Sequence, residues 1–200
     1  MTKIEISREN IGKGFKLETG TKHTFALGPF TVHVIELEGL HFHLDSAVLL
    51  PVEPKETEAA KDAITPFDAL AVCMTHAEDN PDHRLIISAH ADTSGQAPHN
   101  LKLSEERGAN VLAVLTGEKP GFVSVSKARH KVRDYQRILT WIAATEVFDC
   151  DPNGVDDHHG DDTTKAIRNF QQSYNDAGIG TEIGANGKMT DETRGAIFDT

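Results

Sequence analysis

The chain has 200 residues, enough for one large domain or two small ones. Its 38% hydrophobic and 26% charged residues are typical of a globular protein, and no apolar run approaches the roughly 20 residues that a membrane-spanning helix needs. The net charge of −11 and the lack of a continuous run of four basic residues exclude the basic face that nucleic-acid binding requires.

The first forty residues predict strands. Residues 1–6 lack the apolar segment of a secretory signal. Residues 25–37 are rich in β-branched and aromatic side chains and contain a turn at Gly28-Pro29, which indicates strands. Residues 40–44 alternate with a period of two, which is typical of a half-buried strand.

A helix is expected between residues 65 and 79. Thr65 is a candidate N-cap, and Pro66 fills the first helical position, where its missing N–H is harmless. Asn80-Pro81 ends the helix. The predicted inner face consists of Phe67, Leu70, Ala71 and Met74.

A strand, a loop and a second helix follow. Residues 84–89 predict a short buried strand, residues 92–100 a loop, and the helix after it ends at Gly117. The predicted inner face of this helix consists of Leu101, Gly108, Val111, Leu112 and Leu115. With the preceding elements, the order is strand, helix, strand, helix, so we expect residues 1–120 to form an α/β sandwich.

The strand signal nearly vanishes after Pro120-Gly121. We expect residues 121–130 to be a linker and residues 131–200 to be a small helical module, so that the whole chain is of the α+β class. The helical signals begin near residue 126, at Asp162 or Thr163, and at Thr190. The predicted inner faces are Val132, Tyr135, Leu139 and Ile142, then Ala166, Ile167, Phe170 and Tyr174, then Ala196, Ile197 and Phe198.

Asp92 and Arg107 are the first candidate binding residues. Asp92 directly follows the predicted strand and Arg107 lies near the start of the next helix, so both are expected where open sheets bind ligands. The guanidinium of Arg107 suits a carboxylate and Asp92 suits an ammonium, so the pair fits a zwitterion. The alternative is an ordinary surface ion pair between the two residues.

Three segments share a pattern with a known family. They are Phe42-x-x-Asp45-Ser46-Ala47-x-Leu49-x-Pro51, Arg84-Leu-Ile-Ile-Ser-Ala-His90-Ala-Asp92-Thr-Ser-Gly95 and Asn100-x-x-Leu103-Ser104-x-x-Arg107-Gly108-x-x-Val111. Together they resemble the OmpA-like peptidoglycan-binding family. The resemblance implies an OmpA-like α/β sandwich in which Asp92 and Arg107 hold the diaminopimelate of the peptidoglycan stem peptide. It also implies that His90, Thr93 and Asn100 shape that site.

The family pattern is incomplete in this chain. Where the family continues with a further strand, helix and strand, this chain enters its helical module. We therefore expect strands from residues 1–37 to complete the sheet. The resemblance further implies a tethering role, in which a larger envelope or secretion assembly is held to the cell wall. The expected location is the periplasm, reached without a visible signal or from a longer natural chain.

The helical module carries a second pattern. It consists of Tyr135-Gln136-x-x-Leu139, Gly154-x-Asp156-x-x-x-Gly160-x-x-Thr163-x-x-Ala166-x-x-x-Phe170-Gln171, and Asn186-Gly187 with Thr193. This pattern over residues 131–200 resembles the three-helix peptidoglycan-binding domain that is often attached to cell-wall hydrolases. The resemblance implies a second wall-binding module, which would add avidity to the first.

Two further patterns point to metals. Asp149-x-Asp151-x-Asn153-Gly154 matches the first six positions of an EF-hand calcium loop, but Gly160 stands where the bidentate glutamate belongs. The 11 histidines include no His-x-x-x-His or His-Glu-x-x-His pattern of a zinc site. We therefore expect residues 149–162 to form a solvated acidic loop, and we expect no metal and no cofactor.

The expected function is binding without catalysis. Neither cysteine has the surroundings of a catalytic thiol. Cys73 is expected to be a buried small side chain, and a disulfide between Cys73 and Cys150 is not favoured. One alternative is a zinc-dependent cell-wall hydrolase that uses the histidine- and aspartate-rich loop at 150–162. Another is an assembly component that has kept the folds but lost the ligand.

Overall fold

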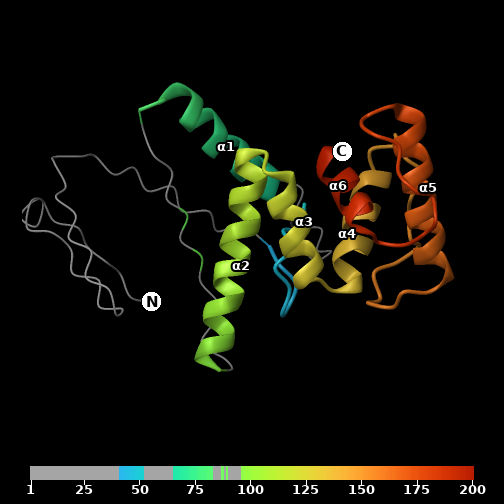
Figure 1. Cartoon of the computed structure of the whole chain (residues 1–200), viewed down its shortest axis with the longest axis horizontal. Coiled ribbons are helices and arrows are strands. Elements are labelled where there is room, and N and C mark those ends of the chain that lie inside the picture. The colour runs from blue at the N-terminus through green and yellow to red at the C-terminus, as the bar shows by residue number, and fades with distance from the viewer. Residues whose placement is uncertain (1–40, 52–64, 83–86, 88, 90–95) are drawn as a thin grey trace, which may run out of the picture. The chain divides into compact units, whose positions relative to one another are not determined.

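The structure, a computed structural model, describes residues 41–51, 65–82, 87, 89 and 96–200. Six helices lie in these ranges: α1 (Pro66–Asp79), α2 (Ala97–Thr116), α3 (Lys119–Ala128), α4 (Val132–Ala143), α5 (Asp161–Ala177) and α6 (Asp191–Asp199) (Figure 1). The described ranges contain no strand, and their β-type pairing is limited to one isolated antiparallel bridge between His41 and Leu50.

The expected α+β class, with its OmpA-like α/β sandwich, is therefore wrong, because the described part of the chain is helical. The strands predicted within residues 1–37 lie outside the described residues. Of the strand predicted at 84–89, Ile87 and Ala89 are described, and neither lies in a strand.

The segment 41–51 shows why the strand expected at its start is absent. Its backbone groups bond to helices instead of to a neighbouring strand. The N–H of Leu49 donates to Oδ1 of Asn110 on α2 (3.1 Å), and the N–H of Ala47 donates to the carbonyl of Arg129 at the end of α3 (3.1 Å). The face that the alternation predicted is also not the buried one, because Leu44 is 78% exposed whereas His43 is buried.

Helix α1 begins where the sequence predicts. The hydroxyl of Thr65 accepts from the backbone N–H of Asp68 (3.1 Å), and the carboxylate of Asp68 accepts from the backbone N–H of Thr65 (2.9 Å), so the two form a capping box. The predicted inner face is only partly right, because Leu70 is buried whereas Phe67 is 41% exposed. Phe67 stacks on Trp141 of α4, with ring centroids 5.3 Å apart.

Helix α2 ends at Gly117, as predicted, and this glycine takes a left-handed φ of 69°. Its buried face differs from the prediction, because Leu101 and Leu112 are exposed whereas Asn110 is fully buried. Asn110 is buried because its amide oxygen holds the segment 41–51. A search for apolar periodicity does not detect a buried polar residue of this kind.

Residues 121–130, expected to be a linker, lie mostly in α3. Pro120 stands in the first turn, where its missing N–H costs no helical hydrogen bond and its fixed φ suits a helix. Phe122 and Ser126 are buried, and Phe122 packs against Phe198 of α6 with ring centroids 5.2 Å apart. Helix α3 also packs along α2 (Figure 1), so it contacts helices on both sides of the predicted domain boundary.

Helices α4, α5 and α6 enclose the larger hydrophobic core. The predicted inner residues that are buried there are Tyr135, Leu139, Ile142, Ala166, Ile167, Phe170, Tyr174 and Ala196. Phe148, from the loop between α4 and α5, packs against Phe170 with centroids 5.7 Å apart. Cys150 is buried in the same core, Cys73 is buried in α1 as predicted, and both are free thiols.

A smaller core joins the segment 41–51 to α1 and α2 through Leu49, Leu70 and Val111. Val48, the residue before Leu49, belongs to the larger core of the helical module. Adjacent residues of one irregular segment therefore enter two different cores. Within the described ranges, every helix is too short or too polar to cross a membrane.

Gly187 and Gly178 give a matched test of the backbone of the helical module. Both have positive φ, 72° and 63°. A Cβ on Gly187 would lie 2.8 Å from the carbonyl oxygen of Thr164, whereas one on Gly178 would meet nothing within 4 Å. We expect Gly178→Ala to lower the free energy of unfolding by about 1–2 kcal/mol, the left-handed penalty alone, and Gly187→Ala to lower it clearly further. Chemical denaturation measures both, and equal losses would contradict the close approach at residue 187.

Candidate functional site

Arg107 lies half-buried on α2, and its guanidinium bonds to the segment 41–51. Its Nε donates to the carbonyl of Ser46 (2.9 Å), and one Nη donates to the carbonyl of His43 (3.1 Å). The guanidinium carbon lies 4.9 Å from the centre of the Phe42 ring, a cation–π contact. The planar guanidinium of Arg107 therefore fixes the turn at residues 43–46 against α2. That structural role stands beside the predicted role of Arg107 in binding a carboxylate.

The other residues of the predicted diaminopimelate site are placed less fully. His90, Asp92 and Thr93 lie outside the described residues, so the pairing of Asp92 with the arginine stays a prediction. Asn100 is half-buried in the first turn of α2, where its backbone N–H donates to the carbonyl of Gln96 (3.0 Å). Gln96 occupies the N-cap position, so Asn100 does not cap this helix.

Asp134, in the first turn of α4, is a fully buried carboxylate that no sequence pattern indicated. It accepts from Nδ1 of His43 (2.7 Å), from the hydroxyl of Ser46 (2.7 Å) and from the backbone N–H of Lys131 (2.6 Å). Because Ser46 bonds to the carboxylate and not to the histidine, these side chains do not form the Ser–His–Asp relay of a hydrolase. The network instead fastens the segment 41–51 to α4.

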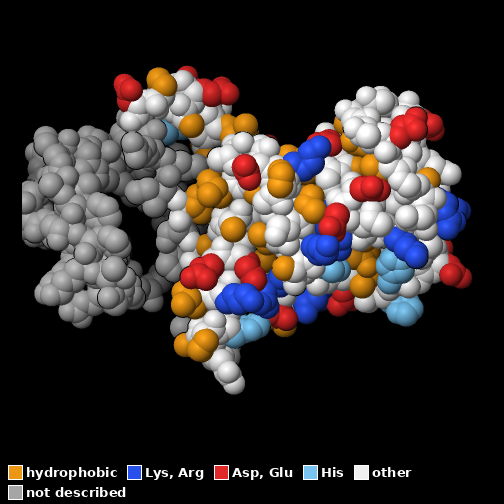
Figure 2. All heavy atoms as spheres, viewed as in Figure 1, with side chains coloured by type: hydrophobic (Ala, Val, Ile, Leu, Met, Phe, Trp, Pro, Cys, Tyr) orange, Lys and Arg blue, Asp and Glu red, His pale blue; other side chains and the backbone are white. Residues whose placement is uncertain are grey.

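Asp45 is the centre of a charge cluster next to this network. It has a left-handed φ of 56°, and its carboxylate contacts Arg129 (3.0 Å), Lys131 (3.2 Å) and His99 (3.0 Å). Arg129 also pairs with Glu106 of α2. Figure 2 shows acidic, basic and histidine side chains gathered over α2. The hydrogen bond from Lys131, with the nearby charges of Lys131, His99 and Arg129, lowers the pKa of Asp45.

Gln136 of α4 is almost fully buried and braces the first loop of the helical module. Its Nε2 donates to the carboxylate of Asp156 (2.7 Å) and to the hydroxyl of Thr163 (2.9 Å). Its Oε1 accepts from the backbone N–H groups of Asp156 (3.2 Å) and Asp157 (3.0 Å). Thr163 in turn donates to the carbonyl of His158 (3.2 Å), so one amide side chain ties the loop to the start of α5.

Gln171 of α5 braces the second loop in the same way. Its Nε2 donates to the hydroxyl of Thr193 (2.7 Å) and to the carbonyl of Lys188 (3.0 Å). Its Oε1 accepts from the backbone N–H of Gly187 (2.9 Å). Thr193 donates to the carbonyl of Lys188 (3.0 Å), so this loop is tied to the start of α6.

The two loops therefore repeat one design. In the first, Asp156 accepts from the backbone N–H of His158 (2.9 Å), and in the second, Asn186 accepts from the backbone N–H of Lys188 (2.8 Å). His158 and Lys188 are exposed at equivalent positions. The dipeptides Tyr135-Gln136 and Phe170-Gln171 are the sequence signal of this repeat, but the partners of each glutamine cannot be read from the chain.

The acidic loop between α4 and α5 offers no ligand set for a metal. Within the described residues, no three or more His, Cys, Asp or Glu side chains lie close enough together to hold a metal ion. The thiol of Cys150 points into the core and donates to the carbonyl of Leu139 (3.5 Å). Burial, with smaller contributions from Asp149 and Asp151, raises the pKa of Cys150 to about 12. A protonated thiol is a poor nucleophile.

No protein-family model matches the chain, and comparison with curated proteins and with solved structures gives no match. Function is therefore inferred from the chain's own residues, above all from the two braced loops.

Arg107→Ala tests the structural role of the guanidinium. The carbonyls of Ser46 and His43 would each lose a charged donor, so we expect the free energy of unfolding to fall by about 1–3 kcal/mol. Arg168→Ala, at an exposed position of α5, is the matched control and is expected to change stability little. If Arg107→Ala left the denaturation curve unchanged, the fork would not hold the turn and the ligand role alone would remain.

Asp45→Asn tests the charge cluster, since asparagine tolerates the left-handed backbone and removes the charge. A lowered pKa in the folded state means that the carboxylate adds stability above its ordinary pKa of 3.8 and loses that contribution as the pH falls through the lower folded-state value. The carboxylate is 42% exposed, so we expect a loss below about 1 kcal/mol near neutral pH. Melting curves at several pH values should show the two proteins converge in acid, and a constant difference would contradict the assignment.

Proposed function

We propose that this protein binds peptidoglycan without cutting it and tethers a larger envelope or secretion assembly to the cell wall. One observation carries the proposal. The polar residues of the pattern that resembles the three-helix wall-binding domain are the residues that brace the two loops, namely Gln136, Thr163, Gln171, Asn186-Gly187 and Thr193. The residues of the pattern therefore share one structural role, which is to hold the two loops in place.

The two braced loops supply the binding surface in this proposal. Each loop is fixed by hydrogen bonds from its backbone N–H groups to a buried glutamine side chain, so its exposed side chains extend from a rigid backbone. His158 and Lys188 offer donors to the hydroxyl and carboxylate groups of a glycan with peptide stems. Because the wall polymer repeats, two equivalent loops can engage neighbouring units and raise the overall affinity.

A binding role fits the described residues better than the rival role as a zinc-dependent cell-wall hydrolase. A zinc-dependent hydrolase needs several converging metal ligands, and among the described residues, which include the loop 150–162, no three His, Cys, Asp or Glu side chains lie close enough together to hold a metal ion. Cys150 is buried, and its thiol is protonated near neutral pH. These features favour holding the polymer over hydrolysing it.

The predicted diaminopimelate site is a second contact in the same proposal. The ammonium group would bind Asp92 and the carboxylate would bind Arg107. Since Arg107 also donates to the carbonyls of the turn at 43–46, a bound stem peptide would stiffen that turn. The proposal places the protein in the cell envelope, on the periplasmic side.

Co-sedimentation with purified sacculi that contain diaminopimelate tests the proposal. We expect the full chain to sediment with the sacculi and to release no soluble muropeptides. Release of muropeptides would contradict a binding-only role and favour the hydrolase. A chain that stays in the supernatant would contradict wall binding and favour an assembly component that has lost its ligand.

Three variants separate the contacts. His158→Ala combined with Lys188→Ala removes one donor from each loop and is expected to weaken retention about tenfold or more, since each hydrogen bond contributes roughly 1 kcal/mol. Asp92→Asn tests the diaminopimelate pair. Lys165→Ala, exposed on α5, is the control and should sediment like the wild-type chain. Unchanged retention of the double variant would contradict the assignment of the surface to the loops.

A further inference from the structure

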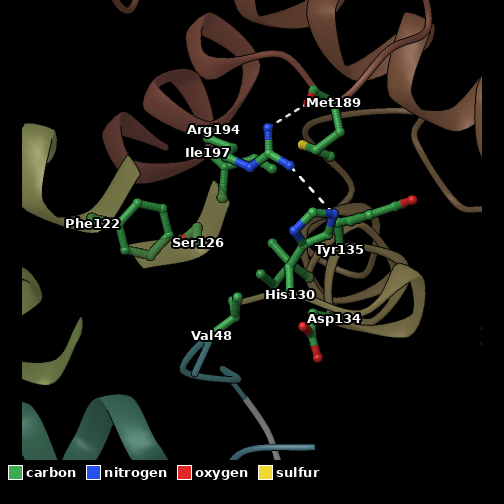
Figure 3. Close-up of a pocket in the computed structure, with 10 residues that line it drawn as sticks. Val48, Phe122, Ser126, His130, Asp134, Tyr135, Met189, Arg194 and Ile197 are labelled. Atoms are coloured by element: carbon green, nitrogen blue, oxygen red, sulfur yellow. Dashed lines mark hydrogen bonds between the residues drawn. The ribbon is translucent and has the colours of Figure 1, made fainter. Parts of the chain in front are cut away.

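A cavity that the proposed function does not use lies between α3, α4, α6 and the segment 41–51 (Figure 3). Its apolar wall includes Val48 from the segment, Phe122 from α3, Ile138 from α4 and Ile197 from α6. The cavity has a volume of about 20 Å³, so it accepts the end-group of a molecule and not a whole sugar or peptide.

Arg194 of α6 places a nearly buried charge at this cavity, since the residue is 7% exposed. One of its Nη atoms donates to the carbonyl of Met189, and the other lies 3.5 Å from Nε2 of His130. Among the described residues its ion-pair partner is Asp191 at 3.9 Å, and Lys127 holds that carboxylate at 2.7 Å. A buried cation with so distant a counter-charge is costly.

His130 faces the guanidinium as an acceptor. Because arginine only donates, Nε2 of His130 carries no proton, and the ring proton is on Nδ1, toward the carbonyls of Lys127 and Ser126. Loss of solvent around the ring, and then the charge of Arg194, lowers the pKa of His130. The lowered pKa keeps the ring neutral near neutral pH, and protonation of Nε2 would make it a second donor to a bound anion.

Ser126 adds a buried hydroxyl that bonds to no other described residue. It is 4% exposed, and its Oγ has no hydrogen-bond partner within the described part of the chain. A serine inside a helix generally points to solvent or bonds to a carbonyl four residues earlier, and this one does neither. Ser126, on α3, lines the same cavity as Arg194 and His130 (Figure 3). A buried hydroxyl without a protein partner in a cavity is available to a bound acceptor.

We propose that this cavity binds a carboxylate that carries a small apolar group. Arg194 supplies the charge and forked donors, and Ser126 supplies a hydroxyl donor. The wall at Phe122 and Ile197 takes a methyl group. A free short-chain acid and a peptide that ends in alanine share this chemistry. The site differs from the two loops and from Asp92 and Arg107, so it stands or falls apart from wall binding.

Nuclear magnetic resonance titration of the full chain tests the site. The probes are acetate, alanyl-alanine and alanyl-alanine amide, which keeps the methyl groups but lacks the free carboxylate. We expect saturable shifts for residues around the cavity with acetate or with the dipeptide, and none with the amide. Tighter binding of the dipeptide identifies a peptide end, and tighter binding of acetate identifies a free acid. Saturation by neither acid, or equal binding of the amide, overturns the proposal.

Two variants and two controls localise the binding. Ser126→Ala removes a hydroxyl without a bond, so the fold should be unchanged, and we expect affinity to fall about five- to tenfold. Arg194→Lys keeps the charge but loses the fork, and we expect at least about a tenfold loss. Ser124→Ala on α3 and Arg168→Lys on α5 are exposed controls that should bind normally. Normal binding by Ser126→Ala and Arg194→Lys overturns the proposal.

A pH series adds a readout that a structural role would not move. The ionisable groups facing His130 are Arg194 on α6 and Asp134 and Tyr135 on α4. A bound carboxylate favours the protonated ring, so affinity in the wild-type chain should rise as the pH falls through the pKa of His130. His130→Gln should remove this rise, and a rise that persists in His130→Gln would contradict the role of the histidine.

Comparison with sacculus sedimentation keeps the two proposals apart. Saturable acetate or dipeptide binding by a chain that does not sediment supports the cavity and contradicts wall binding. Sedimentation without binding of either acid supports wall binding and overturns the cavity site. If Ser126→Ala loses acid binding but still sediments fully, the cavity is a separate site, as proposed.

Discussion

The buried carboxylate of Asp134 is the interaction on which the arrangement of the described chain depends. It fixes two residues of the segment 41–51, His43 and Ser46, to the start of α4. Removing a partner from a buried charge costs about 3–5 kcal/mol, so the carboxylate strongly favours this position of the segment. Once the segment is fixed there, Val48 reaches the larger core and Leu49 the smaller one. The irregular segment thus pairs its backbone groups and buries its apolar side chains as a strand would, but its partners are helices.

Within the helical module, two neutral amides do the equivalent work. An amide side chain both donates and accepts, so Gln136 and Gln171 can each satisfy a loop's N–H groups and a carbonyl or hydroxyl together. A carboxylate in either place would lose the donor half of the network. The loops are therefore rigid through their backbones, which leaves their outward side chains to set specificity. Rigid loops on a small helical core suit a binding module, because little conformational entropy is lost when a polymer docks.

Local chemistry made part of this structure predictable. The capping box at Thr65, the left-handed Gly117 and the inner face of α5 follow from residues close together in the chain. The faces of α1 and α2 were harder, because polar Asn110 is buried and Phe67 finds its partner on another helix. Asp134 and His43 lie 91 positions apart, and no periodicity connects them. The predicted sheet failed for the same reason, because the partners of the segment 41–51 lie on helices far away in the chain, at Asn110 and Arg129.

The two arginines show how environment decides chemistry. Arg107 belongs to a motif, yet its fork donates to carbonyls of a turn, so part of its bonding capacity serves the fold. Arg194 belongs to no motif, yet it is more deeply buried and has a carboxylate no nearer than 3.9 Å among the described residues. Carbonyl dipoles satisfy a guanidinium's hydrogens but only partly offset its charge, and that shortfall grows with burial. We therefore expect a bound anion to stabilise Arg194, in the cavity beside Ser126, more than it stabilises Arg107. The difference comes from the surroundings of each guanidinium, because the residue type is the same.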